Sequence, residues 1–354
     1  MASLDVAPEI TPFIPREINS VADTGLSMNF LSDLVMKVVY FRGTISGSEV
    51  ANHIGLPFGN VTERVLENLR RQSLMTVQGG ASLPSSYEYM VTSKGHAKAL
   101  ELVERSTYAS VAPVPIPMYW ESVQGQSIRG VVVTREKLMR AFPHLVLPPR
   151  LYSQLGPAIN SARSVFLFGP SGNGKTSIAE TAAHLLGGSI YIPQCIEYDS
   201  QIVQLYDPVQ HHQIDRPERT SEATMDRRWM LCDRPVVSAG GELTMATLDL
   251  VWSETSRYYE APVQLKANGG VLLIDDFGRQ QVAPHDLLNR WIVPLEKRED
   301  YLNLRTGQRL RVPFDVLIMF ATSMDPRTLV DDAFLRRIRY KIEVPNPNRE
   351  EYTQ

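Results

Sequence analysis

The sequence contains the stretch Gly169-Pro170-Ser171-Gly172-Asn173-Gly174-Lys175-Thr176, which directly follows the apolar run Val165–Phe168. A glycine, four residues and then Gly-Lys-Thr form the pattern of a phosphate-binding loop between a strand and a helix. Glycines allow the backbone N–H groups of such a loop to curl around phosphate oxygens, while the helix that follows directs the positive end of its dipole at them. The stretch therefore predicts a nucleoside triphosphate as the ligand.

Two side chains of this loop have direct roles in that pattern. Lys175 reaches the β- and γ-phosphates, and the Thr176 hydroxyl ligates Mg²⁺. An accidental glycine turn is the alternative, and it is disfavoured because a strand pattern precedes the stretch and a helical pattern follows it. The residues predicted to bind ATP are Gly169, Pro170, Ser171, Gly172, Asn173, Gly174, Lys175, Thr176 and Ser177.

Length and composition are those of an ordinary globular protein. The chain has 354 residues, of which 43% are hydrophobic and 21% charged, so it can form two domains with a core each. Its formal net charge of −3 provides no overall attraction to nucleic acid or to an anionic membrane. Cys195 and Cys232 have no metal-ligand spacing and fit buried thiols in a reducing compartment. Because no apolar run is long enough to span a membrane and no signal peptide is seen, we expect a cytoplasmic protein without membrane contact.

The first 105 residues predict an arm followed by a small α+β domain. Prolines at positions 8, 12 and 15 disfavour a regular helix, so residues 1–25 are expected to form a flexible arm. The apolar spacing beyond the arm predicts helices and strands in the order helix 26–41, helix 46–54, helix 60–72, strand 74–78, strand 87–92 and helix 94–105. This order resembles the winged-helix domain, which we expect over residues 26–105.

Residues 106–127 and 128–354 differ in pattern. The first segment contains Pro113, Pro115 and Pro117 and few apolar pairs, which predicts a semi-rigid linker. In the second segment, apolar runs alternate with helical or longer stretches, which predicts an α/β fold with a parallel sheet and helices on both faces. The runs expected to form its strands are 165–168, 189–192, 271–274, 316–321 and 340–344.

A second motif, Val271-Leu272-Leu273-Ile274-Asp275-Asp276, is typical of a buried strand that ends in two carboxylates. It resembles a Walker B segment. The resemblance implies that Asp275 holds Mg²⁺, directly or through water, and that Asp276 orients and polarises the attacking water. Asp276 stands where glutamate is usual, and its side chain is one methylene shorter, so the water must lie closer or hydrolysis is slow. The alternative is that both acids only cap the strand end.

Two further segments extend the resemblance. The apolar run 316–320 is followed closely by Thr322-Ser323, and Asp331-Asp332-Ala333-Phe334-Leu335-Arg336-Arg337-Ile338 comes after it. Together with the two Walker segments, these resemble the AAA+ ATPases, over residues 131–344. The resemblance implies that Ser323 senses the γ-phosphate, a place usually held by asparagine, with Thr322 as the competing candidate.

The same resemblance assigns a role to two arginines. Arg336 and Arg337 lie where AAA+ proteins carry an arginine finger, which reaches the ATP of a neighbouring subunit and stabilises the charge that develops on the transferring phosphoryl group. The alternative is that the paired arginines only complement a helix end. A finger that acts between subunits implies a homo-oligomer, such as a hexameric ring.

A hairpin is predicted ahead of the 316–321 strand, because residues 301–305 and 308–312 flank Thr306-Gly307. This placement resembles the pre-sensor hairpin of the AAA+ branch that includes MoxR-type chaperone ATPases and NtrC-type activators. The polymerase-contact signature of the activators is absent, and so is the aromatic pore loop of threading unfoldases. The sequence stops at Gln354, where the helical lid of the family would begin, so a fragment or a missing lid is expected.

The front domain allows two kinds of partner. Its third predicted helix exposes acids as well as bases, and basic and acidic residues nearly balance over residues 26–105. This is weak support for phosphate contacts, so we expect a protein client in preference to DNA. The leading hypothesis is an ATP hydrolase that couples nucleotide state to remodelling of a protein partner. A DNA-binding regulator with ATP as a switch, and a hydrolysis-poor ATP-binding scaffold, are the alternatives.

Overall fold

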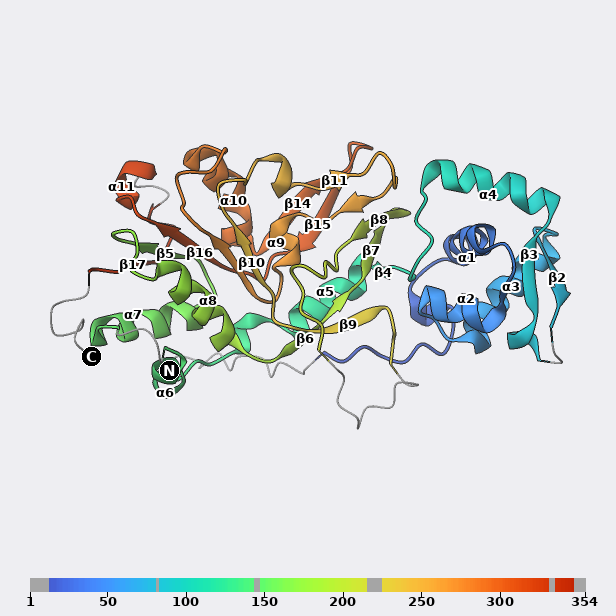
Figure 1. Cartoon of the computed structure of the whole chain (residues 1–354), viewed down its shortest axis with the longest axis horizontal. Coiled ribbons are helices and arrows are strands. Elements are labelled where there is room, and N and C mark those ends of the chain that lie inside the picture. Colours follow the sequence, from blue (N-terminus) through green and yellow to red (C-terminus); the bar gives the residue numbers. More distant parts are fainter. Residues whose placement is uncertain (1–12, 81–82, 143–146, 215–224, 331–334, 347–354) are drawn as a thin grey trace, which may run out of the picture.

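A five-stranded parallel sheet forms the centre of the second half of the chain (Figure 1). The computed structural model describes residues 13–80, 83–142, 147–214, 225–330 and 335–346. All four strand pairings in this sheet are parallel, and its three inner strands are buried almost throughout, as expected where helices cover both faces. In spatial order the strands are β10 (Val236–Ala239), β13 (Val271–Ile274), β16 (Leu317–Thr322), β5 (Val165–Phe168) and β17 (Tyr340–Glu343).

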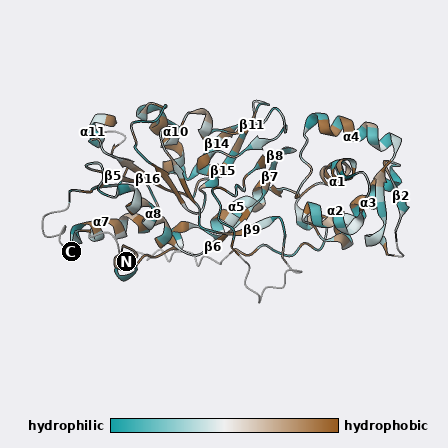
Figure 2. Cartoon of the chain, viewed as in Figure 1, coloured by the Kyte–Doolittle hydropathy of each residue, from teal (hydrophilic) through white to brown (hydrophobic). Residues whose placement is uncertain are grey.

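Helices pack on both faces of this sheet. Alternate residues of a strand point to opposite faces, so Val165 and Leu167 lie in one apolar cluster and Phe166 lies in the other. The first cluster is closed by α6 (Arg135–Ala141), α7 (Pro149–Asn160) and α8 (Lys175–Leu186), and the second by α10 (Pro284–Lys297). Figure 2 shows the central strands as predominantly apolar. The predicted α/β class, with a parallel sheet covered on two sides, is confirmed.

One expected strand of the parallel sheet is wrong. Residues 189–192 belong to β6 (Ser189–Pro193), which pairs antiparallel with β9 (Trp229–Asp233) in a separate two-stranded sheet. One edge of the parallel sheet is formed instead by β10, and the other by β17. Strand β10 is four residues long and alternates buried Val237 and Ala239 with exposed Ser238, so it lacks the continuous apolar run that identifies the inner strands.

A second, mixed sheet lies between the parallel sheet and the front of the chain (Figure 1). Beside it, the expected hairpin is confirmed as the antiparallel pair β14 (Glu299–Asn303) and β15 (Arg309–Pro313). Two short helices complete this half of the chain, α9 (Val263–Lys266) and α11 (Pro326–Leu329). The mixed sheet has the order β11 (Val251–Trp252), β12 (Tyr259–Glu260), β8 (Gln201–Gln204), β7 (Cys195–Tyr198) and β4 (Val114–Pro115).

The expected linker over residues 106–127 is wrong for its central part. β4 pairs with β7, and α5 (Ile116–Gly125) buries Tyr119 and Val123 in the core of the mixed sheet. The prolines do not prevent this helix, because Pro115 is its N-cap and Pro117 lies in its first turn, where no intrahelical N–H bond is lost.

The front part of the chain, residues 28–105, which is called the front half below, has the predicted order of elements. Ser46 and Glu49 form a capping box at the start of the second helix. The third helix begins at Glu63 instead of residue 60, because Gly59 and Asn60 are not helical. A short strand, β1, adds to the two expected strands and gives the sheet order β1-β3-β2. The elements are α1 (Met28–Arg42), β1 (Ile45–Ser46), α2 (Gly47–Ile54), α3 (Glu63–Arg71), β2 (Met75–Gly79), β3 (Glu88–Val91) and α4 (Ser93–Arg105).

The expected flexible arm over residues 1–25 is packed where the structure describes it. Residues 1–12 lie outside the described part of the chain. The Phe13 ring lies with its centroid 5.1 Å from that of Trp229, and Ile18 is buried in the core of the front half. The arm therefore contacts both halves of the chain. Burial of its apolar side chains holds it in place although it forms no regular helix or strand.

A buried ion pair joins the arm to the second half of the chain. Arg228 and Asp226 are both buried, and Nη2 of the arginine lies 2.9 Å from Oδ2 of the aspartate. The same guanidinium donates hydrogen bonds to the carbonyl oxygens of Thr24, at 2.8 Å, and Pro113, at 3.1 Å. We call Asp226 and Arg228 with these two carbonyls the joint. It connects segments that are distant in sequence through one side chain.

Among the described helices, none combines the length and the apolar character that crossing a membrane requires.

Candidate nucleotide site

The loop between β5 and α8 has a backbone that requires glycine. Gly169, Gly172 and Gly174 have φ angles of 143°, 85° and 72°, a region that other residues rarely adopt. A Cβ atom at position 169 would also lie 2.3 Å from the carbonyl oxygen of Val344. Helix α8 begins directly after Gly174, so the N–H groups of its first turn, which have no intrahelical partners, follow the loop without a side-chain cap. This backbone can bind an anion.

Lys175 lies inside the loop. Its Nζ donates hydrogen bonds to the carbonyl oxygens of Gly169, at 2.9 Å, and Pro170, at 2.8 Å, and the residue is 9% exposed. Burial lowers the pKa of the Lys175 ammonium from its usual value, and the carboxylates of Asp275 and Asp276 act against that shift. The two acids predicted from the second motif therefore lie close enough to the loop lysine to influence its charge.

The predicted Mg²⁺ ligands are in contact. The Thr176 hydroxyl donates a hydrogen bond of 2.9 Å to Oδ2 of Asp275, which lies one residue beyond the end of β13. No group of three or more His, Cys, Asp or Glu side chains that could hold a metal exists among the described residues. Mg²⁺ is commonly bound by one or two carboxylates together with substrate phosphates and water. The hydroxyl and carboxylate oxygens present therefore fit this ion.

Asp276 is exposed and has a left-handed backbone. Its φ is 47°, and its N–H donates a hydrogen bond to Oδ1 of Asp275 at 2.9 Å. The turn is held by Gln280, whose Nε2 donates to the carbonyl oxygens of Asp275, at 2.7 Å, and Asp276, at 3.2 Å. Aspartate adopts positive φ more readily than glutamate does, because its short side chain can bond locally. The backbone thus gives a physical reason for aspartate at this position.

The end of β16 separates the two candidates for the sensor. The Thr322 hydroxyl donates to the carbonyl oxygen of Phe277, at 2.7 Å, and accepts from the N–H of Met324, at 3.1 Å, in a side chain that is 1% exposed. Thr322 is therefore committed to the structure of the site. Ser323 is half-buried. It directly follows Thr322, which is paired with Phe168 on the neighbouring strand β5, and Gly169 directly follows Phe168. Ser323 and the first residue of the loop therefore lie at the same edge of the sheet.

The two candidate arginines differ in their surroundings. Residues 331–334 of this segment lie outside the described part of the chain. Both Arg336 and Arg337 are exposed, and Nε of Arg337 lies 2.7 Å from Oε1 of Glu296 in α10. Arg336 lines an open pocket of about 680 Å³ beside Phe168, the last residue of β5. Arg337 is thus occupied within its own chain, whereas Arg336 faces an open surface.

Two residues make positioning contacts that the sequence patterns do not predict. Gln280, described above, holds the turn that carries both acids. Asn173, which the loop pattern treats as a variable position, donates from Nδ2 to the carbonyl oxygen of Val344, at 3.1 Å, and to Oδ1 of Asn346, at 3.0 Å. It therefore ties the loop to the chain that leaves β17. Gln280 belongs to no spacing that could have identified it, and the loop pattern that includes Asn173 does not predict these contacts.

Comparisons with known proteins give only distant likenesses. No protein-family model matches the chain, and no curated protein matches it. Among solved structures, NtrX from Brucella abortus in complex with ADP is 15% identical, with a TM-score of 0.33, over 59% of this chain and 38% of that chain. The ATP complex of NtrX is 17% identical, with a TM-score of 0.33, over 59% and 40%.

A complex between the BchI and BchD subunits of magnesium chelatase is 18% identical, with a TM-score of 0.39, over 64% of each chain. The chain thus spans well under half of NtrX and less than two thirds of this second neighbour. Likenesses of this size do not assign the chain to a family.

Proposed function

We propose that the chain is an AAA+ ATPase, which binds and hydrolyses ATP with Mg²⁺ and couples its nucleotide state to the remodelling of a protein partner. The observation that carries this proposal is the contact of 2.9 Å between the Thr176 hydroxyl and Asp275, which brings the phosphate-binding loop and the acidic strand end together. A glycine turn or a capped strand end alone would not require that contact.

In this proposal each side chain of the site has a separate role in phosphoryl transfer. Lys175 exchanges its two loop carbonyls for phosphate oxygens, and the loop N–H groups bind the remaining ones. Thr176 and Asp275 would hold Mg²⁺, which neutralises charge on the phosphates. Asp276 orients the attacking water and receives its proton. The Ser323 hydroxyl donates a hydrogen bond to the γ-phosphate.

Asp276→Asn is expected to lower phosphate release by about a hundredfold while ATP stays bound, because the amide cannot accept a proton from the water. Asparagine tolerates positive φ as aspartate does, so the backbone of the turn is preserved. Phosphate release and retention of ATP on the purified protein measure the two effects. Light scattering of the same samples reports whether ATP drives assembly.

Asp286→Asn is the matched control, because it removes an exposed aspartate near the start of α10 with a side chain that is 65% exposed. The control should hydrolyse ATP like the unaltered protein. Equal phosphate release in the two variants would contradict the proposed role of Asp276, because hydrolysis would then proceed without its carboxylate.

Arg336→Ala is expected to lower phosphate release by about a thousandfold with little change in ATP affinity, if its guanidinium meets the phosphate of a neighbouring copy. Arg337→Ala should lower phosphate release much less, because the Arg337 guanidinium is paired with Glu296 of its own chain. This exposed pair contributes at most about 1 kcal/mol to the stability of the fold. Phosphate release measured against protein concentration separates action between copies from action within one.

Mixing two inactive variants tests directly whether Arg336 acts on the nucleotide of a neighbouring copy. Arg336→Ala retains its nucleotide loop, and Lys175→Ala retains its arginine, so a mixture of the two inactive variants should recover hydrolysis at shared interfaces. Hydrolysis by Arg336→Ala alone, or a mixture that stays inactive, would refute a finger at position 336.

We further propose that residues 26–105 form a winged-helix domain that docks the protein client of a homo-oligomeric ring. In support, α3 and the strands β2 and β3 lie at the end of the molecule farthest from the parallel sheet (Figure 1). On α3, Arg71 is paired with Glu67, which neutralises one of the cations that a nucleic acid would need. The balance of charge on this helix therefore supports a protein client over DNA.

A further inference from the structure

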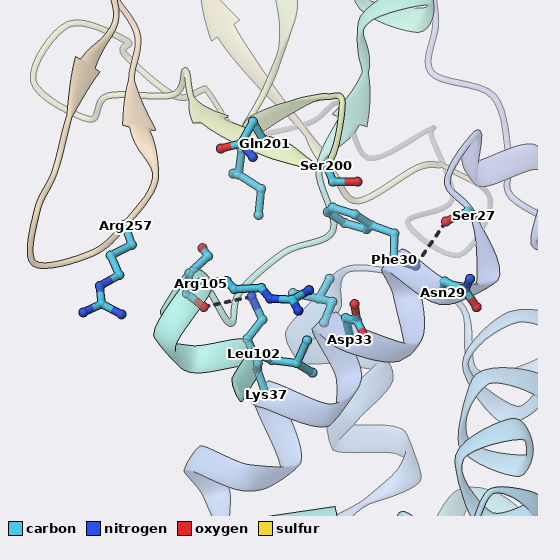
Figure 3. A pocket seen from close by; sticks show the side chains of 13 residues that line it. Ser27, Asn29, Phe30, Asp33, Lys37, Leu102, Arg105, Ser200, Gln201 and Arg257 are labelled. Carbon is cyan, nitrogen blue, oxygen red and sulfur yellow. Dashed lines mark hydrogen bonds between the residues drawn. The ribbon is translucent and has the colours of Figure 1, made fainter. Parts of the chain in front are cut away.

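An open cavity of about 460 Å³ lies at the junction between the front half of the chain and the mixed sheet (Figure 3). Its walls come from α1, the end of α4, the turn between β7 and β8, and Arg257 before β12. The volume falls in the range of pockets that hold small molecules. None of these walls belongs to the parallel sheet that carries the nucleotide loop, so the cavity is separate from that site.

The charged side chains that line the cavity are mostly cationic. Arg105, Arg257 and Lys37 line it together with the carboxylate of Asp33, and Arg105 is also paired with Glu101. In Figure 3 the Arg105 side chain extends toward Phe30 and Asp33. The lysine is 6% exposed and donates from Nζ to the carbonyl oxygen of Ser106, at 3.2 Å. Burial lowers the pKa of Lys37 to about 8, and burial raises the pKa of Asp33 above its usual value.

The remaining lining is apolar and aromatic. Phe30 of α1, Leu102 of α4 and Ile202 of β8 face the same space as the cations. Gln201 adds an amide from the β7–β8 side of the cavity. An apolar wall beside several cations matches a ligand with a flat apolar body and an anionic group. A bare inorganic anion would leave the apolar wall unused.

We propose that this junction cavity binds a small organic anion, whose charged group contacts Arg105 and whose apolar body lies against Phe30 and Ile202. Because α1 and α4 belong to the front half and β8 to the mixed sheet, the bound anion connects the two halves of the chain. The site is independent of the proposed ATPase activity.

The test is a fluorescence titration with 8-anilinonaphthalene-1-sulfonate, an aromatic sulfonate that fits this description. Saturating ATP and Mg²⁺ are present so that the probe does not occupy the nucleotide loop. One saturable site is expected, and Arg105→Gln should weaken its affinity about tenfold, because a charge-assisted contact is lost. Phe30→Ala should lower the fluorescence of the bound probe.

The chain offers a matched control for the arginine. Arg71 in α3 is exposed and paired with Glu67 four residues earlier, as Arg105 is paired with Glu101 in α4. Arg71→Gln removes the same charge from the same type of pair at a distance from the cavity, so the probe should bind it with unchanged affinity. Absence of saturable binding, or equal affinities in Arg71→Gln and Arg105→Gln, would overturn the proposal.

Discussion

Lys175→Ala is expected to lower the affinity for ATP by at least about a hundredfold, because the alanine cannot donate to the phosphate oxygens and leaves their charge unbalanced inside the loop. The effect is large because the lysine is buried at the centre of the loop, where water replaces it poorly. Nucleotide affinity measured by calorimetry or by a fluorescent ATP analogue gives the change directly.

Lys137→Ala is the control for the loss of one lysine. This side chain is exposed on α6, which packs on the same face of the sheet as α8, and it should leave ATP affinity unchanged. The Lys175→Ala protein should unfold close to the temperature of the unaltered protein in the absence of nucleotide. ATP affinity that survives the Lys175→Ala change would exclude the loop as the triphosphate site and would remove the basis for ATP hydrolysis.

Arg228→Met should destabilise the chain by about 3–5 kcal/mol, because it leaves the buried Asp226 carboxylate without its cation. Nε1 of Trp229 still donates to Oδ2 of that carboxylate at 3.0 Å, and the backbone N–H of residue 228 still donates to Oδ1 at 3.0 Å, but two neutral donors do not balance a buried charge. The carbonyl oxygens of Thr24 and Pro113 also lose their donor. Urea unfolding followed by tryptophan fluorescence reports the change, since Trp229 adjoins the pair.

The neighbouring residue provides the control. Arg227 is exposed and donates to Oδ1 of Asn52, at 2.9 Å, and to the carbonyl oxygen of Leu56, at 3.1 Å, so Arg227→Met should cost about 1 kcal/mol or less per lost bond. Replacing both charges, with Asp226→Leu added to Arg228→Met, should recover part of the loss. A single Arg228→Met variant as stable as Arg227→Met would show that the buried ion pair between Asp226 and Arg228 does not stabilise the fold.

The parts of the fold that the sequence predicts well are those whose chemistry leaves a local pattern. Three glycines in the loop are needed for positive φ, and a buried parallel strand needs a continuous apolar run such as residues 271–274. These local requirements identified four of the five strands of the parallel sheet. They also identified the helices of the front half, where the cap formed by Ser46 and Glu49 is a local signal.

The remaining elements depend on tertiary structure. Strand β10 lies at an edge and has a short, half-exposed pattern, whereas residues 189–192 are apolar because they pack in another sheet. The prolines of residues 113–117 read as a linker, yet the same prolines start α5 when a strand and a core are available to receive it. A sequence pattern does not distinguish a proline that starts a helix from one that prevents it.

The candidate site shows the same division. The loop and the two acids come from motifs, and the structure brings Thr176 and Asp275 into contact. The choice between Thr322 and Ser323 needs the partner of each hydroxyl, which no spacing contains. Asn173 and Gln280 donate to carbonyl oxygens that any residue could offer, so no sequence pattern predicts these two contacts.

The left-handed backbone at Asp276 limits which side chains could take over the role that we propose for it. A glutamate would extend the reach of the proposed general base, but it would also incur roughly 1–2 kcal/mol of conformational strain in the turn. Asparagine and glycine adopt that backbone readily but have no carboxylate. In a lineage that keeps this turn, substitution at position 276 would therefore be biased toward residues that cannot accept a proton, and a longer base would first need a different turn.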